Sequence, residues 1–286
     1  MNFRSLLAPL FSFGGPPKLH VWQRFEPLGK GLAGTMSQFF KVREKETGNI
    51  YGLKLPDIAK LAPIEARFKG LKKPSEGEIS LQIRGDHVVT THECGLTHDG
   101  GQYILQEFLE GVLVHLRLKR DEPLSLDERI LIIRQLAAGV QTVHQAGFVH
   151  RDICPRNLMI DGSGRVTLFD FGLTVPDSPA FLRPGNRSGT PNYMSPEVIR
   201  RRQSDRRLDI FSFGVSAYEI CCGLLPWPGG NARAALAHDT PAPDVRERAA
   251  EIPDKLADSI MECLRPEPDD RPESMEVFLR KTARLT

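Results

Sequence analysis

Two groups of polar residues have the composition and spacing of a site that binds a divalent metal and activates a hydroxyl group. The first is the run HRD, which ends at Asp152 and is followed five residues later by Asn157. The second is the run DFG, which begins at Asp170. Because Mg²⁺ prefers oxygen ligands and commonly takes only one or two protein carboxylates, we predict that Asn157 and Asp170 bind a metal. Asp152 is then left to orient a hydroxyl nucleophile and accept its proton.

A glycine-rich segment near the N-terminus has the chemistry of a phosphate-binding loop. Gly29, Gly31 and Gly34 fit the pattern GxGxxG. In a Rossmann dinucleotide site a helix follows this pattern at once, whereas here residues 39–42 (FFKV) favour a strand. The alternative is a hairpin whose glycines let backbone N–H groups approach phosphate oxygens. Lys54 lies in the next strand-like run and, taken alone, would be interpreted as a solvated strand residue.

The chain up to about residue 110 is predicted to form an antiparallel sheet of hairpins. Short apolar or alternating runs, separated by Gly, Asn and Asp, occupy residues 25–28, 39–43, 50–55, 88–91 and 103–108. A helical pattern interrupts them at residues 61–83. Pro74 divides this helix because proline lacks the N–H group that a helix interior needs.

Helices dominate after residue 111. The run SLDE at residues 125–128 is a capping box, and the apolar residues after it recur at helical spacing as far as Gly147. Three more helices are predicted at residues 209–222, 254–264 and 272–283. Two strand-like runs, residues 158–160 and 166–168, are predicted to form a hairpin between Asn157 and Asp170.

Composition excludes several classes of protein. The 286 residues are 40% hydrophobic and 26% charged, which indicates a globular core, and the net charge of +2 provides no basic field for a nucleic acid or an anionic membrane. No run approaches the roughly 18 apolar residues of a membrane span. Five cysteines without CxxC spacing argue against a disulfide scaffold or a zinc site and favour the cytoplasm. The apolar residues 6–13 are expected to be a short arm, because Pro9 interrupts a signal-like run.

Two further runs, GTPNYMSPE at residues 189–197 and DIFSFG at 209–214, follow in order. With them the chain resembles a eukaryotic-type (Hanks-type) protein kinase domain of the serine/threonine kind over residues 22–284. The resemblance implies an α+β, bilobal fold: a small antiparallel sheet with one main helix, followed by a larger helical lobe. The expected divisions are an N-terminal arm at residues 1–20, a small lobe at 21–110 and a large lobe at 111–286.

The resemblance assigns roles to the residues above. Lys54 would hold the α- and β-phosphates of ATP, Asp152 would be the catalytic base, and Asn157 and Asp170 would hold Mg²⁺, with Mn²⁺ as the alternative ion. These groups are expected to meet around the triphosphate in the cleft between the lobes. The remaining nucleotide-binding positions implied by the family are Gly29, Gly31, Gly34, Glu107 and Leu109, with Gln106 as the gatekeeper.

Three other residues would have structural roles in such a domain. Asp209 would brace the catalytic loop, while Glu197 and Arg271 would form a buried pair that fastens the activation segment. Glu78 is our choice for the helix glutamate that pairs with Lys54, although the run SEGE at residues 75–78 is also a capping box. The spacing of 20 residues from Gly34 to Lys54 exceeds the family's usual one. Either the glycine loop carries an insertion or residues 36–38 form its tip.

The catalytic loop departs from the family pattern at one position. Cys154 stands where serine/threonine kinases usually present a lysine to the γ-phosphate, and Arg156 stands where tyrosine kinases place an arginine that could supply the charge. Cys154 is expected to be a small, half-buried residue rather than a redox-reactive thiol. Arg151 resembles the arginine that clamps a phosphorylated activation segment, for which Ser178 and Ser188 are the candidates.

We therefore expect a cytoplasmic protein kinase that transfers the γ-phosphoryl group of ATP to Ser or Thr of protein substrates. An upstream or trans-autophosphorylating kinase is a further expected partner, whereas nucleic acid and a membrane span are not expected. A pseudokinase scaffold is the main alternative, which Cys154 and the unusual glycine loop favour and the intact catalytic residues oppose. A small-molecule phosphotransferase of related fold is disfavoured by the segment at residues 189–197.

Overall fold

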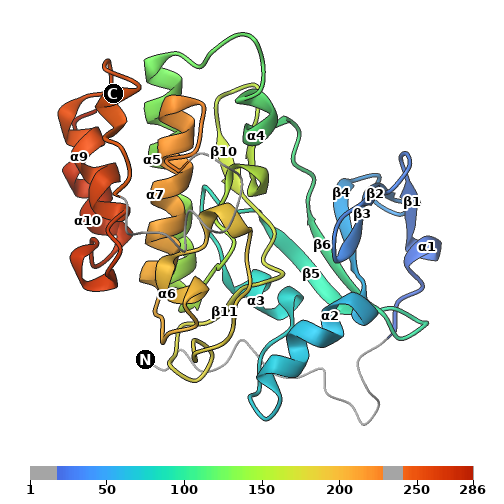
Figure 1. The fold of residues 1–286 in the computed structure, drawn as a ribbon. Helices are drawn as coiled ribbons and strands as arrows, with labels where there is room; N and C mark the ends of the chain where they lie inside the picture. Colours follow the sequence, from blue (N-terminus) through green and yellow to red (C-terminus); the bar gives the residue numbers. More distant parts are fainter. Residues whose placement is uncertain (1–17, 228–240, 286) are drawn as a thin grey trace, which may run out of the picture. The chain divides into compact units, whose positions relative to one another are not determined.

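The computed structural model describes residues 18–227 and 241–285, in which the chain forms two compact units (Figure 1). Unit 1 comprises the residues up to Ile64 together with Thr91–Phe108, and unit 2 comprises Glu65–Thr90 and Leu109–Thr286. Residues 1–17 of the predicted arm lie outside the described residues. Within the described ranges, no helix combines the length and the apolar character that crossing a membrane requires.

Unit 1 is a six-stranded antiparallel sheet with the order β1-β3-β4-β6-β5, in which β2 pairs with β3. A short helix, α1 (Val21–Arg24), precedes it. The predicted hairpins are confirmed with one exception, which concerns residues 88–91. The strands are β1 (Phe25–Pro27), β2 (Leu32–Ala33), β3 (Ser37–Glu44), β4 (Ile50–Pro56), β5 (Thr91–Leu96) and β6 (Gln102–Glu107).

Alternate residues of the central strands build the core of unit 1. Val42 of β3 and Leu53 of β4 are fully buried, together with Phe25 and Leu105. Because successive side chains of a strand point to opposite faces, Lys54 lies on the other face from Leu53. Only 8% of Lys54 is exposed, so its interpretation as a solvated strand residue is wrong.

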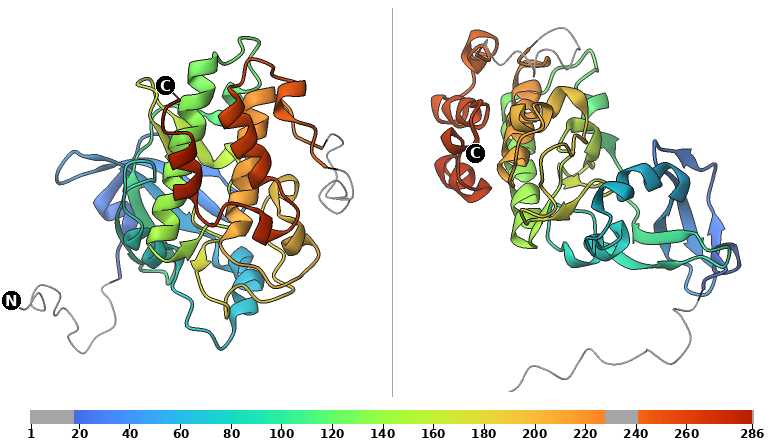
Figure 2. Two further views of the ribbon diagram at one scale, coloured as in Figure 1. Left: turned by 90° about the vertical axis from the view of Figure 1, so that its left-hand side faces the viewer. Right: turned by 60° about the horizontal axis from the view of Figure 1, so that its bottom comes forward.

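Unit 2 is organised around two long helices, α5 (Leu126–Gln145) and α7 (Arg207–Cys222). The capping box predicted for α5 is present: the Ser125 N–H donates to Glu128 Oε2 at 2.7 Å, and the Glu128 N–H donates to Ser125 Oγ at 3.2 Å. α7 is buried on nearly every side. α9 (Asp254–Cys263) packs on α7, and α10 (Met275–Lys281) packs on α5, which forms a second helical layer (Figure 2).

Short strands in unit 2 position the polar motifs. β9 (Leu158–Ile160) lies between β7 (Val112–Leu113) and β10 (Val166–Leu168), and β8 (Phe148–Val149) pairs with β11 (Val175–Pro176). A short helix, α4 (Val114–Arg117), follows β7. Asn157 directly precedes β9, and Asp170 follows β10, so both lie at the open end of the antiparallel β9–β10 hairpin. A backbone hydrogen bond of 3.0 Å from Phe169 N to Asn157 O closes that end.

The helical segment predicted within the small lobe is divided between the two units, and its C-terminal part, with α3, belongs to unit 2. It consists of α2 (Ile58–Glu65), the 3₁₀ turn η1 (Ala66–Phe68) and α3 (Glu76–Gln82), and the division between the units falls after Ile64. Ile79 and Ile83 of the α3 region are fully buried in the large core, which explains why α3 joins unit 2. The second division, after Phe108, lies two residues from the predicted boundary at 110.

Residues 88–91, predicted as a strand, do not form one. Val88 makes only an isolated bridge to Leu168, and the Val89 N–H donates to Leu168 O at 2.9 Å. Both valines are buried in the large core. Their apolar pattern therefore reflects packing beside β10 rather than membership of the sheet, and β5 begins only at Thr91.

A buried ion pair links the short helix α6 (Pro196–Ile199) to the segment before α10. Arg271 Nη1 and Nη2 donate to Glu197 Oε1 and Oε2 at 2.9 and 2.8 Å. Both residues are buried. The guanidinium also donates to three backbone carbonyls, those of Arg265, Arg207 and Pro266. The expected Glu197–Arg271 pair is thus present, and both of its charged groups are hydrogen bonded.

We predict that Arg271→Ala lowers the free energy of unfolding by about 3–5 kcal/mol, because the buried Glu197 carboxylate loses its partner. The measurement is urea unfolding followed by tryptophan fluorescence. The double variant Glu197→Gln/Arg271→Met is expected to lose less than Arg271→Ala alone, because it leaves no lone buried charge. If the single and double variants were equally unstable, charge compensation would not be the source of the stability.

Candidate active site

The carboxylate of Asp152 is held on both of its oxygens. Oδ1 accepts hydrogen bonds from the backbone N–H and from Oγ1 of Thr190, both at 2.7 Å. Oδ2 accepts from Asn157 Nδ2 at 3.0 Å, and the same amide group donates to the Asp152 carbonyl at 2.8 Å. Gly189 allows this approach, because a Cβ there would lie 2.6 Å from the Arg151 carbonyl. The side chain predicted as the base is therefore fixed before any substrate binds.

Asp209 holds the backbone of the catalytic loop from within the core. Its Oδ2 accepts from the His150 N–H at 2.7 Å and from His144 Nε2 at 2.9 Å, and its Oδ1 accepts from the Arg151 N–H at 2.7 Å. Burial alone would raise the pKa of Asp209, but the hydrogen bonds and the neighbouring histidines outweigh it and lower the pKa. Arg151 has a positive φ of 70°, which a non-glycine residue rarely adopts. The expected bracing role of Asp209 is present.

Asp170 is exposed, while the next residue points into the core. Phe171 is buried, and its ring packs edge-on against His150 with centroids 5.5 Å apart. Asp170 also has a positive φ, of 68°, and its Oδ1 accepts from the Gly172 N–H at 3.3 Å. Because adjacent side chains diverge, burial of Phe171 directs the Asp170 carboxylate away from the core.

The donor set at the open end of the β9–β10 hairpin fits a magnesium ion. Asn157 uses its amide nitrogen on Asp152, which leaves its carbonyl oxygen as the available ligand. Asp170, next to the residue bonded to Asn157, supplies an exposed carboxylate. One amide oxygen and one carboxylate match the sparse protein ligation that Mg²⁺ prefers when phosphates complete its shell.

The glycine segment of unit 1 forms a β-hairpin rather than a helix start. β2 pairs with β3 through Leu32 and Phe39 and through Ala33 and Gln38. The Gly34 N–H donates to Ser37 O at 2.8 Å, which closes the turn over residues 34–37. The turn therefore includes Met36, while Ser37 and Gln38 already belong to β3.

The three glycines are in or beside this hairpin, and the other expected nucleotide residues of unit 1 follow in β4 and β6. A Cβ at Gly31 would lie only 2.4 Å from the Phe40 ring, so a larger residue here would displace that ring. Lys54 is buried in β4, paired with Phe39 of β3 and Ile104 of β6. Gln106 is buried, and its Nε2 donates to Thr91 Oγ1 at 3.3 Å. Glu107 ends β6 and lies within unit 1, whereas Leu109 begins the next part of unit 2.

The choice of Glu78 as the helix glutamate conflicts with its surroundings. Its Oε2 accepts from the backbone N–H and from Oγ of Ser75 at 2.8 and 2.9 Å, so the carboxylate serves the N-terminal capping box of α3. Glu76 is instead the buried carboxylate of α3, with 9% exposed. A Cβ built on Gly172 would lie 3.5 Å from its Oε2. The structure therefore brings Glu76, which sequence reasoning missed, next to the DFG run.

Two cationic side chains converge on the segment that ends at Ser188. Arg67 Nη1 donates to Ser188 Oγ at 2.6 Å and to the Arg187 carbonyl at 3.1 Å, and Arg151 Nη2 donates to the Asn186 carbonyl at 2.9 Å. Arg151 Nη1 is buried and finds no hydrogen-bond partner among the described residues. Burial lowers the pKa of Arg151 to about 10, and the charge of Arg67 contributes to this shift.

A cavity of about 460 Å³ adjoins this segment and is lined by cations. Its charged lining residues are Arg67, Lys69, Arg183, Arg187 and Arg201, and no carboxylate lines it. A buried donor without an acceptor and a group of uncompensated cations together favour an anion. The role of Arg67 could not be predicted from the sequence, because its hydrogen-bond partners are about 120 residues away.

Cys154 and Arg156 both belong to the catalytic loop, but their side chains have different environments. Cys154 is 1% exposed, and its Sγ lies 3.8 Å from Thr190 Oγ1. Burial raises the pKa of the Cys154 thiol to about 12. Arg156 is exposed on η2 (Pro155–Asn157).

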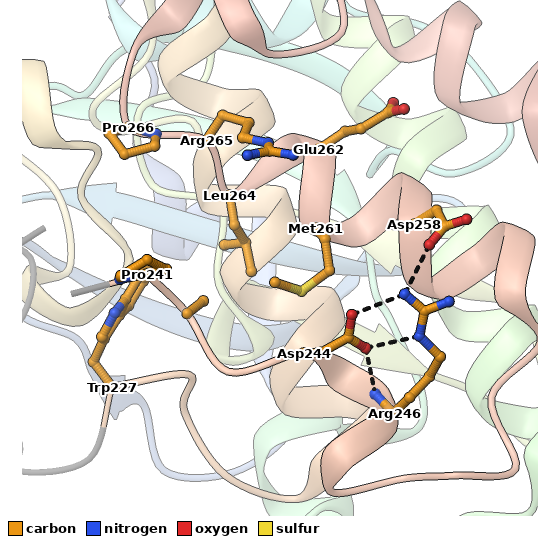
Figure 3. Close-up of a pocket in the computed structure, with 11 residues that line it drawn as sticks. Trp227, Pro241, Asp244, Arg246, Asp258, Met261, Glu262, Leu264, Arg265 and Pro266 are labelled. Carbon is orange, nitrogen blue, oxygen red and sulfur yellow. Dashed lines mark hydrogen bonds and ion pairs between the residues drawn. The ribbon is translucent and has the colours of Figure 1, made fainter.

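A larger cavity of about 630 Å³ lies between η4 (Val245–Glu247) and α9 (Figure 3). One wall carries the ion pairs of Arg246 with Asp244 and Asp258, at 2.8 and 2.9 Å, and Trp227 and Met261 contribute apolar surface. None of the predicted site residues lines this cavity. It is therefore not a candidate for the phosphate chemistry.

We predict that the Cys154 thiol of the folded protein is unreactive at pH 7.5, because the thiolate is the nucleophile and burial keeps this group protonated. Iodoacetamide labelling followed by peptide mass spectrometry should show labelling at least about 100-fold slower than in urea. Half-buried Cys94 serves as the control in the same sample. Equal labelling rates of Cys154 in the native and denatured protein would support the redox-thiol interpretation instead.

Comparisons with known proteins agree with this geometry. A serine/threonine-protein kinase of Myxococcus xanthus, pkn3, is 30% identical over 260 residues, which cover 86% of this chain and 47% of that protein. The serine/threonine-protein kinase PkaA of Streptomyces coelicolor is 30% identical over 265 residues, with the same coverage of 86% and 47%. Human ribosomal protein S6 kinase alpha-2 is 28% identical over 210 residues, which cover 73% of this chain and 28% of that protein.

The chain spans about half the length of the two bacterial relatives. The model of the protein kinase domain family matches residues 22–281, which include the glycine hairpin, Lys54, the catalytic loop, the DFG run and the Glu197–Arg271 pair. The sequence motifs, the two folded units and the hydrogen-bonded catalytic loop all lead to one conclusion: the chain belongs to the protein kinase domain family.

Proposed function

We propose that the protein transfers the γ-phosphoryl group of ATP to serine or threonine hydroxyls of protein substrates. The observation that carries this proposal is the fixed carboxylate of Asp152, whose two oxygens accept from Thr190 and Asn157. A positioned carboxylate can hold a substrate hydroxyl in line and accept its proton as the phosphorus–oxygen bond forms. Because the transition state needs little covalent chemistry, such positioning accounts for much of the catalysis.

We propose the remaining roles from the donor set of Asn157 and Asp170 and from the family pattern. Asn157 and Asp170 would hold Mg²⁺, or Mn²⁺ in its place, and the ion would neutralise charge on the phosphates. Lys54 would bind the α- and β-phosphates, and the backbone N–H groups near Gly29, Gly31 and Gly34 would bind phosphate oxygens. Backbone groups of Glu107 and Leu109 would bind the adenine. For the helix glutamate we now favour Glu76 over Glu78, because the capping box occupies Glu78.

Serine/threonine preference is supported by Thr190, which contacts Asp152 directly. The names of the bacterial relatives agree with it. The cytoplasm is the proposed location, because ATP is abundant there and all five cysteines are free thiols. Incubation with γ-labelled ATP, Mg²⁺ and a mixed protein substrate, followed by phosphoamino-acid analysis, tests activity and hydroxyl preference together. Thermal stabilisation by ATP without label transfer would select the pseudokinase alternative.

We predict that Lys54→Met and Asp170→Ala each lower kcat/KM by about a thousandfold or more, because Lys54 would neutralise charge on the phosphates and Asp170 would hold the metal ion that does the same. The measurement is a steady-state assay with labelled ATP, with circular dichroism to verify folding. Lys45→Met, which removes an exposed lysine in the turn after β3, is the matched control and should retain activity. Turnover near the wild-type rate in Asp170→Ala would contradict the metal assignment.

We further propose that Ser188 is a phosphorylation site that orders the segment before Gly189. Arg67 already contacts the hydroxyl at 2.6 Å, and the buried Arg151 Nη1 offers an unused donor. A phosphate would add nearly two negative charges and three acceptors to this group of cations. The phosphate donor would be a second copy of this protein or an upstream kinase. Ser178 is the less favoured candidate, because no cationic side chain is found bonded to it within the described residues.

We predict that phosphorylation of Ser188 raises kcat/KM by about tenfold, which corresponds to roughly 1.4 kcal/mol, and that Arg67→Ala removes most of this gain. Stoichiometry is followed by mass spectrometry, and activity is measured on the phosphorylated and phosphatase-treated protein. Ser188→Ala should abolish the difference between the two preparations, while the matched serine variant Ser178→Ala should keep it. A phosphatase effect that survives Ser188→Ala would locate the regulatory site elsewhere.

A further inference from the structure

An exposed cation lies directly beside the catalytic residues. Arg156 occupies the middle of η2, immediately before Asn157, whose amide is bonded to both the carbonyl and the carboxylate of Asp152. Its side chain is exposed. No ion pair of Arg156 is found in the described ranges. A guanidinium in this position is accessible to a substrate whose hydroxyl approaches Asp152.

Lys119 is a second exposed cation in the same neighbourhood. It follows α4, and α4 packs against η2, which carries Arg156. After burial, the charges of Arg156 and Lys119 are the causes that lower the pKa of His115 on α4. The same two charges also act on Glu219 of α7. Because α4 packs against η2, the two exposed cations lie on adjoining segments of unit 2.

The carboxylate in this neighbourhood is already engaged. Glu219 accepts a hydrogen bond from the hydroxyl of Tyr193, three residues beyond Thr190. Burial raises the pKa of Glu219, and this outweighs the opposing effects of Tyr193, Arg156 and Lys119. The other carboxylate beside Arg156 is that of Asp152, which is engaged by Thr190 and Asn157.

We propose that Arg156 and Lys119 form a cationic subsite that selects protein substrates with an acidic side chain near the acceptor hydroxyl. The inference rests on the proposed phosphotransfer and names the substrate class for it. The two cations would offset an electrostatic repulsion, because Asp152 and the phosphates of ATP would otherwise repel the carboxylate of the substrate. In this role Arg156 is a specificity residue and does not act on the γ-phosphate as the tyrosine-kinase resemblance implied.

The test uses the whole protein and three matched serine peptides that differ only in having Asp, Ala or Arg at the positions flanking the acceptor. We expect the wild-type protein to prefer the Asp peptide over the Ala peptide by about five- to tenfold in kcat/KM, in keeping with exposed charge pairs. Arg156→Ala and Lys119→Ala should each reduce this preference through KM. Arg156→Glu should invert it in favour of the Arg peptide, while Arg156→Lys should preserve it.

Arg280→Ala, which removes an exposed arginine of α10, is the control and should keep the preference unchanged. Increasing ionic strength should weaken the wild-type preference, because exposed charges are screened. Equal losses of kcat on all three peptides in Arg156→Ala would show that this residue acts on the transferred phosphoryl group, and the proposal would be rejected. A wild-type protein that phosphorylates all three peptides equally would also overturn it. Absence of transfer to any peptide or protein would instead contradict the proposed function itself.

Discussion

The buried carboxylate of Asp209 is the interaction on which the catalytic side of unit 2 depends. It accepts hydrogen bonds from the backbone N–H groups of His150 and Arg151 and from a ring nitrogen of His144. These bonds hold Arg151 at a positive φ of 70°, a conformation that costs a non-glycine residue about 1–3 kcal/mol. Because Asp209 lies on α7 in the centre of the large core, packing of that helix fixes the loop. The neighbouring Asp152 is positioned in consequence.

The cations around this loop differ in burial, and the difference separates their roles. Arg151 is buried with an unused donor, so a firmly held anion at Ser188 would stabilise it. Arg156 and Lys119 are exposed, so they suit a substrate that must bind and leave. Exposed charge pairs contribute little affinity and much selectivity. Two arginines five residues apart in the sequence would thus have different proposed roles, Arg151 in a regulatory contact and Arg156 in a transient one.

Three local patterns had two physical interpretations each, and the surroundings decided between them. The Ser75–Glu78 spacing suits a capping box and also a catalytic carboxylate, and the hydrogen bonds to Ser75 show that the cap is formed. Residues 88–91 have the apolar pattern of a strand but pack beside β10. A lysine in a strand is usually solvated, yet Lys54 is 8% exposed. For residues 88–91 and for Lys54 the deciding neighbours lie on other elements, whereas the partner of Glu78 is only three residues away.

The sequence by itself predicted the fold class and the principal helices, and it proposed Asp152, Asn157 and Asp170 as catalytic positions, because helical periodicity, capping boxes and short motifs are local properties. It also predicted the buried Glu197–Arg271 pair through resemblance. Only the tertiary structure decided that α3 joins the large core and that Glu76 is its buried carboxylate. The contact of Arg67 with Ser188 was equally beyond the sequence, since it spans about 120 residues. Spacing along a chain records which residues share an element, whereas burial and long-range hydrogen bonds depend on how the elements pack.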